Sequence, residues 1–356
     1  GGVDLGCWGM AVPISKLDLL TACGGFDPRR TIPVIIDVGC AGVVDKEKVR
    51  DHSLYTGVKE DRATHRTSEG TVLTSAHHGH GNLIKEFIEA AVQLFGRRCL
   101  LQFEDFDPSD AVPLLRQYRD KYVTCNENLQ GTSAAIVAAL LGAVRLRNPA
   151  CKDLFAELKK ETILFHGAGH ATTGALSLLE KEMGMSKSRL FFTAGFPEGN
   201  GTKYDLVWKD RDGKGGNVQC KEQREYAHFG KPSFDTRNVV RTVNHLKATC
   251  VIGNASHNPG CFSDRFVEAL EDNTRGGHGR PLVLALSSPK TQVEITSKDA
   301  YTWSKGSVIY GSSVAMEPTD VAGKLRCPGQ VSSAYIFPGL SMGVVASHAH
   351  SVPDRL

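Results

Sequence analysis

Residues 162–174 read TILFHGAGHATTG, an apolar run that passes directly into a glycine-rich turn. The run TILF has the apolar, β-branched character of a buried strand, and the residues after the glycines favour a helix. In this context Gly167 permits a tight turn, and Gly169 lets the backbone approach a pyrophosphate at the helix N-terminus. A purely structural turn is the alternative. The residues expected to hold a dinucleotide are Gly167, Ala168, Gly169, Ala171 and Gly174.

The rest of the chain alternates apolar runs with segments of helical periodicity. Further strands are expected at residues 31–38, 99–103, 189–193, 249–253, 281–286 and 307–310. Helices are expected at residues 83–94, 132–146 and 264–271, with Thr132 as the N-cap of the second. Alternating strands and helices predict an α/β fold with a parallel sheet. We expect one domain over residues 1–125 and another over residues 126–356.

The composition favours a folded protein with a small-molecule or protein partner. Hydrophobic residues make up 41% of the 356 residues and charged residues 23%, which is the ordinary globular range. The net charge is only +3, without a long basic run, so neither nucleic acid nor an anionic membrane is an expected partner. The longest uncharged apolar stretch, residues 134–144, is shorter than the ~20 residues of a membrane span. Ten cysteines without a C-x-x-C pair predict reduced thiols in an intracellular compartment.

Polar clusters mark three places along the chain. Residues 61–82 are polar and contain four histidines, which predicts a surface loop, with a transition-metal site as the alternative. Glu104 and Asp105 follow an apolar strand, where the ligands of parallel sheets collect, and their oxygens suit Mg²⁺ or Mn²⁺. Residues 126–132, NENLQGT, precede a helix. A solvated junction and a helix cap are the alternatives for the last two clusters.

Several segments, in this order, resemble the malic enzyme family. The matching segments are GVDLGCWGMAVPISKLDLLTACGGFDP, PVIIDVG, LLQFEDF, YRDKYVTCNENLQGT, ILFHGAGHATTG, ALSSPKTQVEITSKDAYTWSKGSVIYGSS and PGQVSSAYIFPGLSMGVVAS. The resemblance implies an oxidoreductase that decarboxylates malate to pyruvate with NAD or NADP and Mg²⁺ or Mn²⁺. It also implies a remnant of the family's N-terminal domain followed by a Rossmann-type parallel-sheet domain that binds NAD(P). The chain is expected to be a fragment without both termini, including the family's catalytic tyrosine, and the opening GGVDLG lacks an initiator Met.

The resemblance also assigns catalytic and metal-binding residues. Lys16 stands where the family's lysine acts on the C2 hydroxyl, a role for which its pKa should be lowered. Glu127, which keeps a carboxylate beside Asn128, is the second residue assigned as catalytic. Glu104 and Asp105 match two metal ligands. Asn128 stands where the family's third ligand is an aspartate, and an amide brings no charge, so the metal affinity should be weaker.

Three serines replace asparagines of the family pattern. Ser288 and Ser332 are expected to contact the cofactor, and Ser288 and Ser333 the substrate. Serine is shorter than asparagine by an amide group, and an unfilled polar site costs about 1 to 3 kcal/mol.

Two functions remain open at this point: a malic enzyme of divergent sequence, with Lys16 as the base, or a catalytically inactive relative that keeps the fold for binding. Gln223 lies near where relatives that use NADP often carry a lysine, which weakly favours NAD. The loop at Ala194 and Gly195 has no carboxylate to bind the ribose, which favours NADP or poor binding instead, so the choice of NAD or NADP is open. A homo-oligomer is expected, and cytoplasm or mitochondrion is left undecided.

Overall fold

The computed structural model describes residues 11–36, 53, 64–66, 72–74, 83–106, 108–198, 201–212, 215–255, 258–275, 277 and 279–354. It divides the chain into two compact units. The first contains residues 1–131 and 334–354, and the second contains residues 132–333 and the last two residues. The chain therefore passes between units at residues 131 and 132, and residues 334–354 return to the first. Each unit is described by itself.

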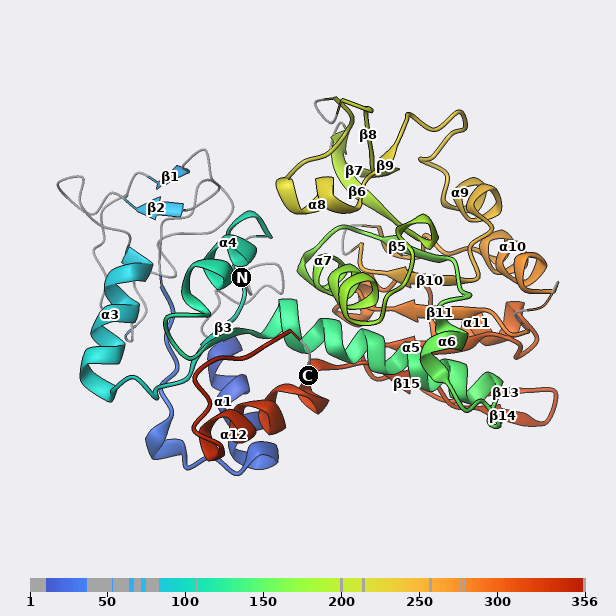
Figure 1. Ribbon diagram of the computed structural model, residues 1–356. Helices are drawn as coiled ribbons and strands as arrows, with labels where there is room; N and C mark the ends of the chain where they lie inside the picture. Colours follow the sequence, from blue (N-terminus) through green and yellow to red (C-terminus); the bar gives the residue numbers. More distant parts are fainter. Residues whose placement is uncertain are drawn as a thin grey trace. The chain divides into compact units, whose positions relative to one another are not determined.

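The second unit is built on a sheet whose strands follow the order β15-β12-β11-β10-β5-β6-β7 (Figure 1). Neighbouring strands are parallel, except that β6 and β7 form an antiparallel pair. The strands are β5 (Ile163–His166), β6 (Leu190–Glu198), β7 (Gly201–Leu206), β10 (Cys250–Gly253), β11 (Leu282–Ala285), β12 (Ile309–Ser312) and β15 (Gly329–Gln330). The chain leaves β5 toward β6 on one side, and the later strands continue from β10 on the other. This is the reversal of strand order at which doubly wound sheets bind ligands. The expected parallel α/β fold is confirmed.

Two groups of helices accompany this sheet. The first group is α5 (Ser133–Arg147), α6 (Leu154–Leu158) and α7 (His170–Ser177), and the second is α9 (Val239–Leu246), α10 (Asp264–Thr274) and α11 (Ser297–Trp303). In the first group α6 and α7 each contact α5, and in the second α9 and α11 each contact α10; Figure 1 shows where these helices lie. Because strand–helix–strand crossovers are right-handed, α7 belongs on one face of the sheet, and α10 and α11 belong on the other. Apolar residues from both strands and helices fill the core, among them Leu164, Val251, Val283, Phe266 and Leu270.

Shorter elements complete the second unit. They are η4 (Leu178–Glu182), η5 (Lys187–Arg189), β8 (Trp208–Lys209), α8 (Lys221–Tyr226), β9 (His228–Phe229), η6 (Lys290–Gln292), β13 (Thr319–Val321) and β14 (Lys324–Arg326), while η7 (Ser333–Tyr335) begins at its end.

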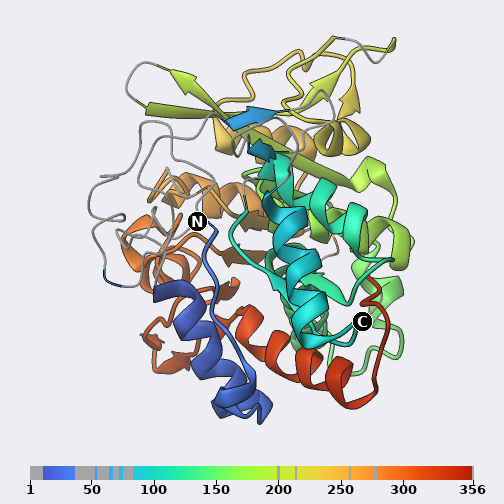
Figure 2. The same cartoon turned by 90° about the vertical axis from the view of Figure 1, so that its left-hand side faces the viewer.

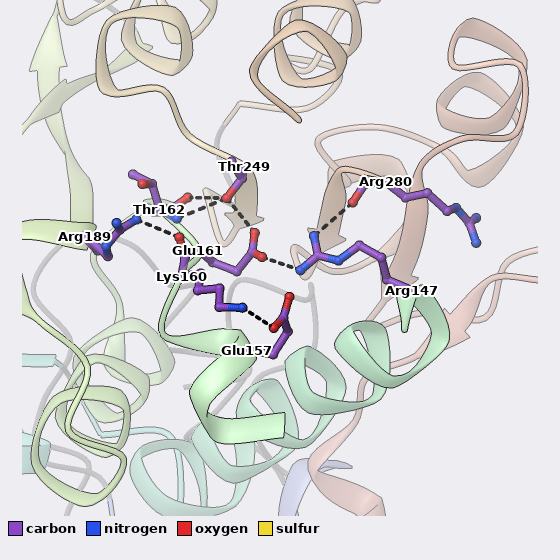
Figure 3. Close-up of polar contacts among 8 residues, drawn as sticks. All are labelled: Arg147, Glu157, Lys160, Glu161, Thr162, Arg189, Thr249 and Arg280. Atoms are coloured by element: carbon purple, nitrogen blue, oxygen red, sulfur yellow. Dashed lines mark hydrogen bonds and ion pairs between the residues drawn. The ribbon is translucent and has the colours of Figure 1, made fainter. Parts of the chain in front are cut away.

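A buried ion pair ties helix α5 to the amino-terminal ends of β5 and β10 (Figure 3). Arg147 at the end of α5 pairs with Glu161, whose side chain is fully buried. The hydroxyl of Thr249 donates a 2.6 Å hydrogen bond to Glu161 Oε2. Arg147 also donates to the carbonyl oxygen of Arg280 at 3.3 Å. The charge of Glu161 is therefore compensated and hydrogen-bonded, as a buried carboxylate requires.

We expect Glu161→Gln to lower the free energy of unfolding by about 3 kcal/mol, because it leaves the Arg147 guanidinium buried without a counter-charge. Urea denaturation at neutral pH measures the change. Glu157→Gln, which removes the charge from the partly exposed ion pair with Lys160, is the matched control and should cost about 0.5 kcal/mol or less. Equal losses in the two variants would contradict this role of the buried pair.

The first unit contains a strand–helix–strand motif of β3 (Leu101–Phe103), α4 (Pro108–Tyr118) and β4 (Thr124–Asn126), with β3 and β4 parallel. Helix α3 (Leu83–Phe95) packs beside it through Ile84 and Ile88, which lie in one core with Phe103 and Leu114. The predicted helix over residues 83–94 and the predicted strand near residues 99–103 are thus confirmed.

Helices α1 (Ala11–Gly24) and α12 (Phe337–Ala346) lie side by side in the first unit (Figure 2). A Cβ atom on Gly24 would lie 3.0 Å from the carbonyl oxygen of Pro338, so the absence of a side chain allows this close approach. The remaining elements of the unit are η2 (Pro28–Arg30), β1 (Thr64–Arg66), β2 (Val72–Thr74) and the π-helix η3 (Glu127–Thr132), which ends at the change of unit.

Three local expectations are wrong. Residues 31–36 form no strand, and Ile32, Val34 and Ile35 are exposed, because β-branched residues form a strand only where a partner strand pairs with them. Residues 64–66 and 72–74, expected in a loop, form an antiparallel pair; His77, His78 and His80 lie outside the described residues. Thr132 makes no side-chain capping bond, because the π-helix η3 runs directly into α5.

The same continuity lengthens the apolar helix. By length and composition alone, the continuous helix Glu127–Arg147 could cross a membrane. The uncharged stretch of residues 134–144 is too short to do so by itself. Half of the apolar window is buried in the structure, and a core helix passes the same test. All eight cysteines in the described part of the chain are free thiols.

Candidate functional site

The carboxyl ends of β3 and β4 bring two acidic residues together in the first unit. In the parallel register Phe103 lies opposite Asn126, so Glu104 and Glu127 each follow at the same edge. Glu127 begins the π-helix η3 and its side chain is buried, while Glu104 is one-fifth exposed. The pairing of the strands, rather than nearness in the sequence, therefore creates the acidic pair.

Lys16 reaches this pair from the second turn of α1. Its Nζ lies 3.2 Å from Glu127 Oε1 and 3.5 Å from Glu104 Oε1. The ammonium also lies 4.8 Å from the ring centroid of Phe337 on α12. The two residues assigned as catalytic, Lys16 and Glu127, thus lie in contact, a meeting that the sequence did not predict. Lys16 is not the surface charge that its residue type alone would favour.

The charges in this cluster shift two pKa values upward. Burial by itself lowers the pKa of Lys16. The charges of Glu127 and Glu104 together raise this pKa by more than burial lowers it, so the net shift is upward. The expectation of a lowered lysine pKa is therefore wrong for this state, because two carboxylates face one ammonium. Burial, and then the charge of Glu127, raise the pKa of Glu104 to about 9. The cluster thus holds more carboxylate groups than its one cation can neutralise.

The excess of carboxylates fits a divalent cation. Glu104 Oε2 is buried and accepts no hydrogen bond from a described group, and hard carboxylate oxygens are ligands for Mg²⁺ or Mn²⁺. Asp105 is exposed and adopts a left-handed backbone conformation with φ 53°. Among the described residues no three His, Cys, Asp or Glu side chains are grouped to hold a metal ion. Convergence of Glu104, Asp105 and the amide of Asn128 stays a prediction.

Gln130 fixes the turn that carries Glu127 and Asn128. The backbone N–H of Asn126 donates to Gln130 Oε1 at 3.0 Å, and the N–H of Leu129 donates to Asn126 Oδ1 at 2.8 Å. Gln130 Nε2 in turn donates to the carbonyl oxygen of Val352 and to Asp354, each at 3.2 Å. The carboxyl-terminal residues of the first unit therefore brace this turn, a contact that no local motif in the sequence indicated.

In the second unit, residues 167–169 form the predicted turn between β5 and α7. Gly167 has φ 117°, and a Cβ atom there would lie 2.1 Å from the carbonyl oxygen of Asn254, so only glycine fits. Gly169 is the N-cap of α7, and Ala168 and Gly169 are partly exposed. Ala171 and Gly174 follow within α7. The strand–turn–helix geometry that a dinucleotide site requires is confirmed.

A hydrogen-bonded pair supports this turn from the neighbouring strand. The N–H of Gly167 donates to Thr193 Oγ1 at 3.1 Å, and the same hydroxyl lies 3.1 Å from His166 Nδ1. Burial lowers the pKa of His166 to about 4, so the imidazole is neutral at physiological pH. The sequence placed His166 and Thr193 at the ends of two predicted strands but did not predict that they meet. Only the register of the strands, with His166 opposite Thr193, shows that they support the Gly167 turn.

We expect the burial of His166 to make the second unit sensitive to acid. The unfolded chain protonates this histidine near pH 6.5 and the folded chain near pH 4, so the unfolded state binds more protons between these values. Stability is thus fully present above pH 6.5 and is lost as the pH falls toward 4. From pH 7 to pH 5 the loss from His166 alone is about 2 kcal/mol.

Urea denaturation of the wild-type chain and of His166→Leu at both pH values measures this difference. The variant should lose about 2 kcal/mol less than the wild type on acidification. Equal pH dependence in the two proteins would show that the histidine does not protonate on unfolding in this range.

The three serines follow parallel strands of the second unit. Ser288 comes three residues after β11 and is exposed, and it precedes Pro289 through a cis peptide bond. Ser332 and Ser333 follow β15 and are partly exposed. The carboxyl ends of parallel strands share one edge of a sheet, which also carries Gly167. Their contacts with a substrate or cofactor stay predictions.

An acidic residue that the sequence did not single out lies opposite the middle of β6. The antiparallel register places Asp205 on β7 opposite Ala194, and Asp205 accepts a short hydrogen bond from the hydroxyl of Thr236. Strand β6 also continues past the predicted end at Thr193 to Glu198, so the strand ends on a carboxylate that the prediction did not consider.

Comparison with known proteins matches two family domains along the chain, and residues 334–354 fall in the second family domain although they belong to the first structural unit. Residues 129–356 match the family model "Malic enzyme, NAD binding domain", and residues 1–119 match "Malic enzyme, N-terminal domain". The chain is similar to NADP-dependent malic enzyme 2 of Arabidopsis thaliana, with 35% identity over 99% of this chain and 54% of that protein. It is 34% identical to the NADP-dependent malic enzyme of Homo sapiens, over 99% of this chain and 55% of that protein.

The chain therefore spans about half the length of the curated relatives it matches. The crystal structure of the Entamoeba histolytica malic enzyme has a similar fold, with a TM-score of 0.55 and 18% identity, over 80% of this chain and 50% of that one.

Proposed function

This chain belongs to the malic enzyme family, and we propose that it carries the catalytic core of an enzyme that oxidatively decarboxylates malate to pyruvate and CO₂. A nicotinamide dinucleotide and a divalent cation complete the reaction. NADP is favoured over NAD by the names of the similar proteins.

The contact of Lys16 with Glu127 and Glu104 is the observation that carries this proposal. A lysine held between a buried carboxylate and a largely buried one is a poor source of stability, since such charges are costly to desolvate. Such a group is typical of a site that moves protons. We assign Lys16 to proton exchange at the C2 oxygen of malate, with Nζ as the exchanging atom, and Glu127 to holding Nζ in place.

Glu104 and Asp105, with the amide oxygen of Asn128, are the residues proposed to hold Mg²⁺ or Mn²⁺. The uncompensated carboxylate of Glu104 supports this assignment. When bound, the cation supplies a Lewis acid that takes up negative charge on the substrate oxygens. Asn128 contributes an oxygen but no charge, so the site should bind the metal more weakly than one with three carboxylates.

The dinucleotide is proposed to lie at the Gly167–Gly169 turn, with its pyrophosphate on the N-terminus of α7. The exposed edge of that turn and the left-handed Gly167 support this placement. Ser288 and Ser332 are proposed to contact the nicotinamide portion, and Ser288 and Ser333 the substrate.

Substitutions at the site favour a second candidate, a malic-enzyme-like protein that binds but does not turn over. Asn128 removes a metal-binding charge, and three serines replace longer amides. Assay of the purified chain with malate, Mn²⁺ and either NADP or NAD decides between them. Reduced dinucleotide with stoichiometric pyruvate supports the enzyme, and dinucleotide binding without either product supports the binding protein.

We expect Asn128→Asp to tighten Mn²⁺ binding about tenfold, because a charged ligand replaces a neutral one in a partly buried site. Isothermal titration calorimetry with Mn²⁺ alone measures the dissociation constant, independently of turnover. Asp120→Asn, at an exposed position in the same unit, is the control and should leave it unchanged. Unchanged Mn²⁺ affinity in folded Asn128→Asp would mean that residue 128 is not a ligand.

A further inference from the structure

Glu294 is a fully buried carboxylate in the second unit for which the proposed reaction has no role. It follows β11 in the chain, and its side chain lies against the end of β10. A Cβ atom on Gly253 would lie 2.4 Å from Glu294 Cδ, so only glycine leaves room for it there. The carboxylate therefore occupies a space that the backbone of β10 leaves open.

The Glu294 carboxylate spans two loops. Oε1 accepts a 2.9 Å hydrogen bond from the backbone N–H of Ala255, in the loop after β10. The same oxygen accepts a short hydrogen bond from the Ser287 hydroxyl, and Oε2 lies 3.5 Å from the Ser287 backbone nitrogen, in the loop after β11. One side chain thus joins the loops that leave two neighbouring parallel strands.

Both loops lead to the proposed dinucleotide site. Asn254, next to Ala255, places its carbonyl oxygen against Gly167, and its Nδ2 lies 3.2 Å from the position of a Cβ on Gly169. The backbone N–H of Asn254 also donates to the carbonyl oxygen of His166 at 2.8 Å. On the other loop, Ser288 follows Ser287 directly. Movement of either loop would therefore shift a neighbour of the glycine turn or the Ser288 hydroxyl.

Stability alone is a weak reason for this carboxylate. Burial raises the pKa of Glu294, against the opposite effect of its hydrogen bonds, so the charged form is disfavoured where it stands. A buried acid with a raised pKa at the ligand edge of a sheet is typical of functional sites.

We propose that Glu294 is a positioning residue for the dinucleotide, because it holds the loops after β10 and β11 at the spacing that the cofactor requires. This inference rests on the proposed function, since it concerns the cofactor of that same site. Glu294 acts through Ala255 and Ser287 and is not a catalytic residue.

The test compares Glu294→Leu with Glu294→Gln in the 356-residue chain, by fluorescence titration with NADPH and with NADH. The leucine variant removes both connections and should raise the dissociation constant at least tenfold. Glutamine keeps one oxygen that can accept from both the Ala255 N–H and the Ser287 hydroxyl, so it should stay within threefold of the wild type. If turnover is measurable, the leucine variant should raise KM for the dinucleotide more than it lowers kcat.

Glu161→Gln is the matched control, because it destabilises the same unit at the amino-terminal ends of β5 and β10. At a temperature where both proteins are folded, it should leave the dissociation constant unchanged. An equal rise in Glu161→Gln would mean that lost stability, not positioning, weakens binding, and would overturn the inference.

A dissociation constant within threefold of the wild type in Glu294→Leu would also overturn it.

Ser287→Ala keeps the Glu294 carboxylate and tests the same connection if the leucine variant fails to fold. We expect its dissociation constant for the dinucleotide to rise at least threefold, and no change would refute the proposal. A wild-type chain that binds neither dinucleotide would overturn the proposed function and this inference with it.

Discussion

Lys16→Met is expected to lower kcat for malate decarboxylation by about a thousandfold, the scale of a positioned proton-transfer group. The substitution keeps the length and much of the volume of the side chain but removes the ammonium that lies 3.2 Å from Glu127 and 3.5 Å from Glu104. Initial rates of reduced-dinucleotide formation with saturating malate and Mn²⁺ measure the effect. Because Lys16 is proposed to act on the substrate and not to contact the dinucleotide, dinucleotide affinity should not change.

Asp18→Asn is the matched control, since Asp18 is exposed on the same helix α1. It should retain kcat within twofold. Circular dichroism must show that both variants are folded, because Lys16→Met leaves two carboxylates without their cation. A folded Lys16→Met protein that keeps more than a tenth of the wild-type kcat would refute the assignment of proton exchange to this lysine.

The second large effect is expected for Gly167→Ala, which should weaken dinucleotide binding at least a hundredfold. The added Cβ would lie 2.1 Å from the Asn254 carbonyl oxygen and 2.6 Å from its carbon, and φ is 117°. A non-glycine residue in that conformation costs about 1 to 3 kcal/mol before the clash is counted. The turn must therefore move away from β10. Fluorescence titration with NADPH measures the dissociation constant.

Gly142→Ala is the control for adding a methyl group to the second unit. Gly142 lies within α5, and nothing lies within 4 Å of a Cβ placed there, so we expect unchanged binding and a gain of about 0.5 kcal/mol in stability. Gly169→Ala is milder than Gly167→Ala, because its Cβ would meet only Asn254 Nδ2 at 3.2 Å. A Gly167→Ala protein that is folded and binds NADPH as the wild type does would exclude the turn from the dinucleotide site.

Local sequence patterns correctly predicted the elements that have a short signature of their own. The run TILF followed by G-A-G became β5, a turn and α7, because a buried strand and a tight glycine turn each have a short sequence signature. Helix α3 followed from its apolar face. The same reasoning was wrong for residues 31–36, because an apolar, β-branched run forms a strand only where another strand is available to pair with it.

The candidate site shows a similar division. Glu104 and Lys16 were assigned by their motifs, yet the upward pKa shift of Lys16 follows from the two carboxylates that pack against it and from no neighbour in the sequence. Glu294 and Gln130 went unrecognised, because a buried polar residue resembles an exposed one until its hydrogen-bond partners are known.

What the sequence alone determined was the α/β class, the glycine turn after β5, and the resemblance to the family to which the chain belongs. These depend on residues a few positions apart, or on motifs that recur in order, and both can be read along a chain. Only the tertiary structure decided that Glu104 and Glu127 share one lysine, that residues 334–354 return to the first unit, and that Glu294 joins two loops. The physical reason is that strand register and burial bring together groups distant in the sequence, and these neighbours set both the charge and the freedom of each side chain.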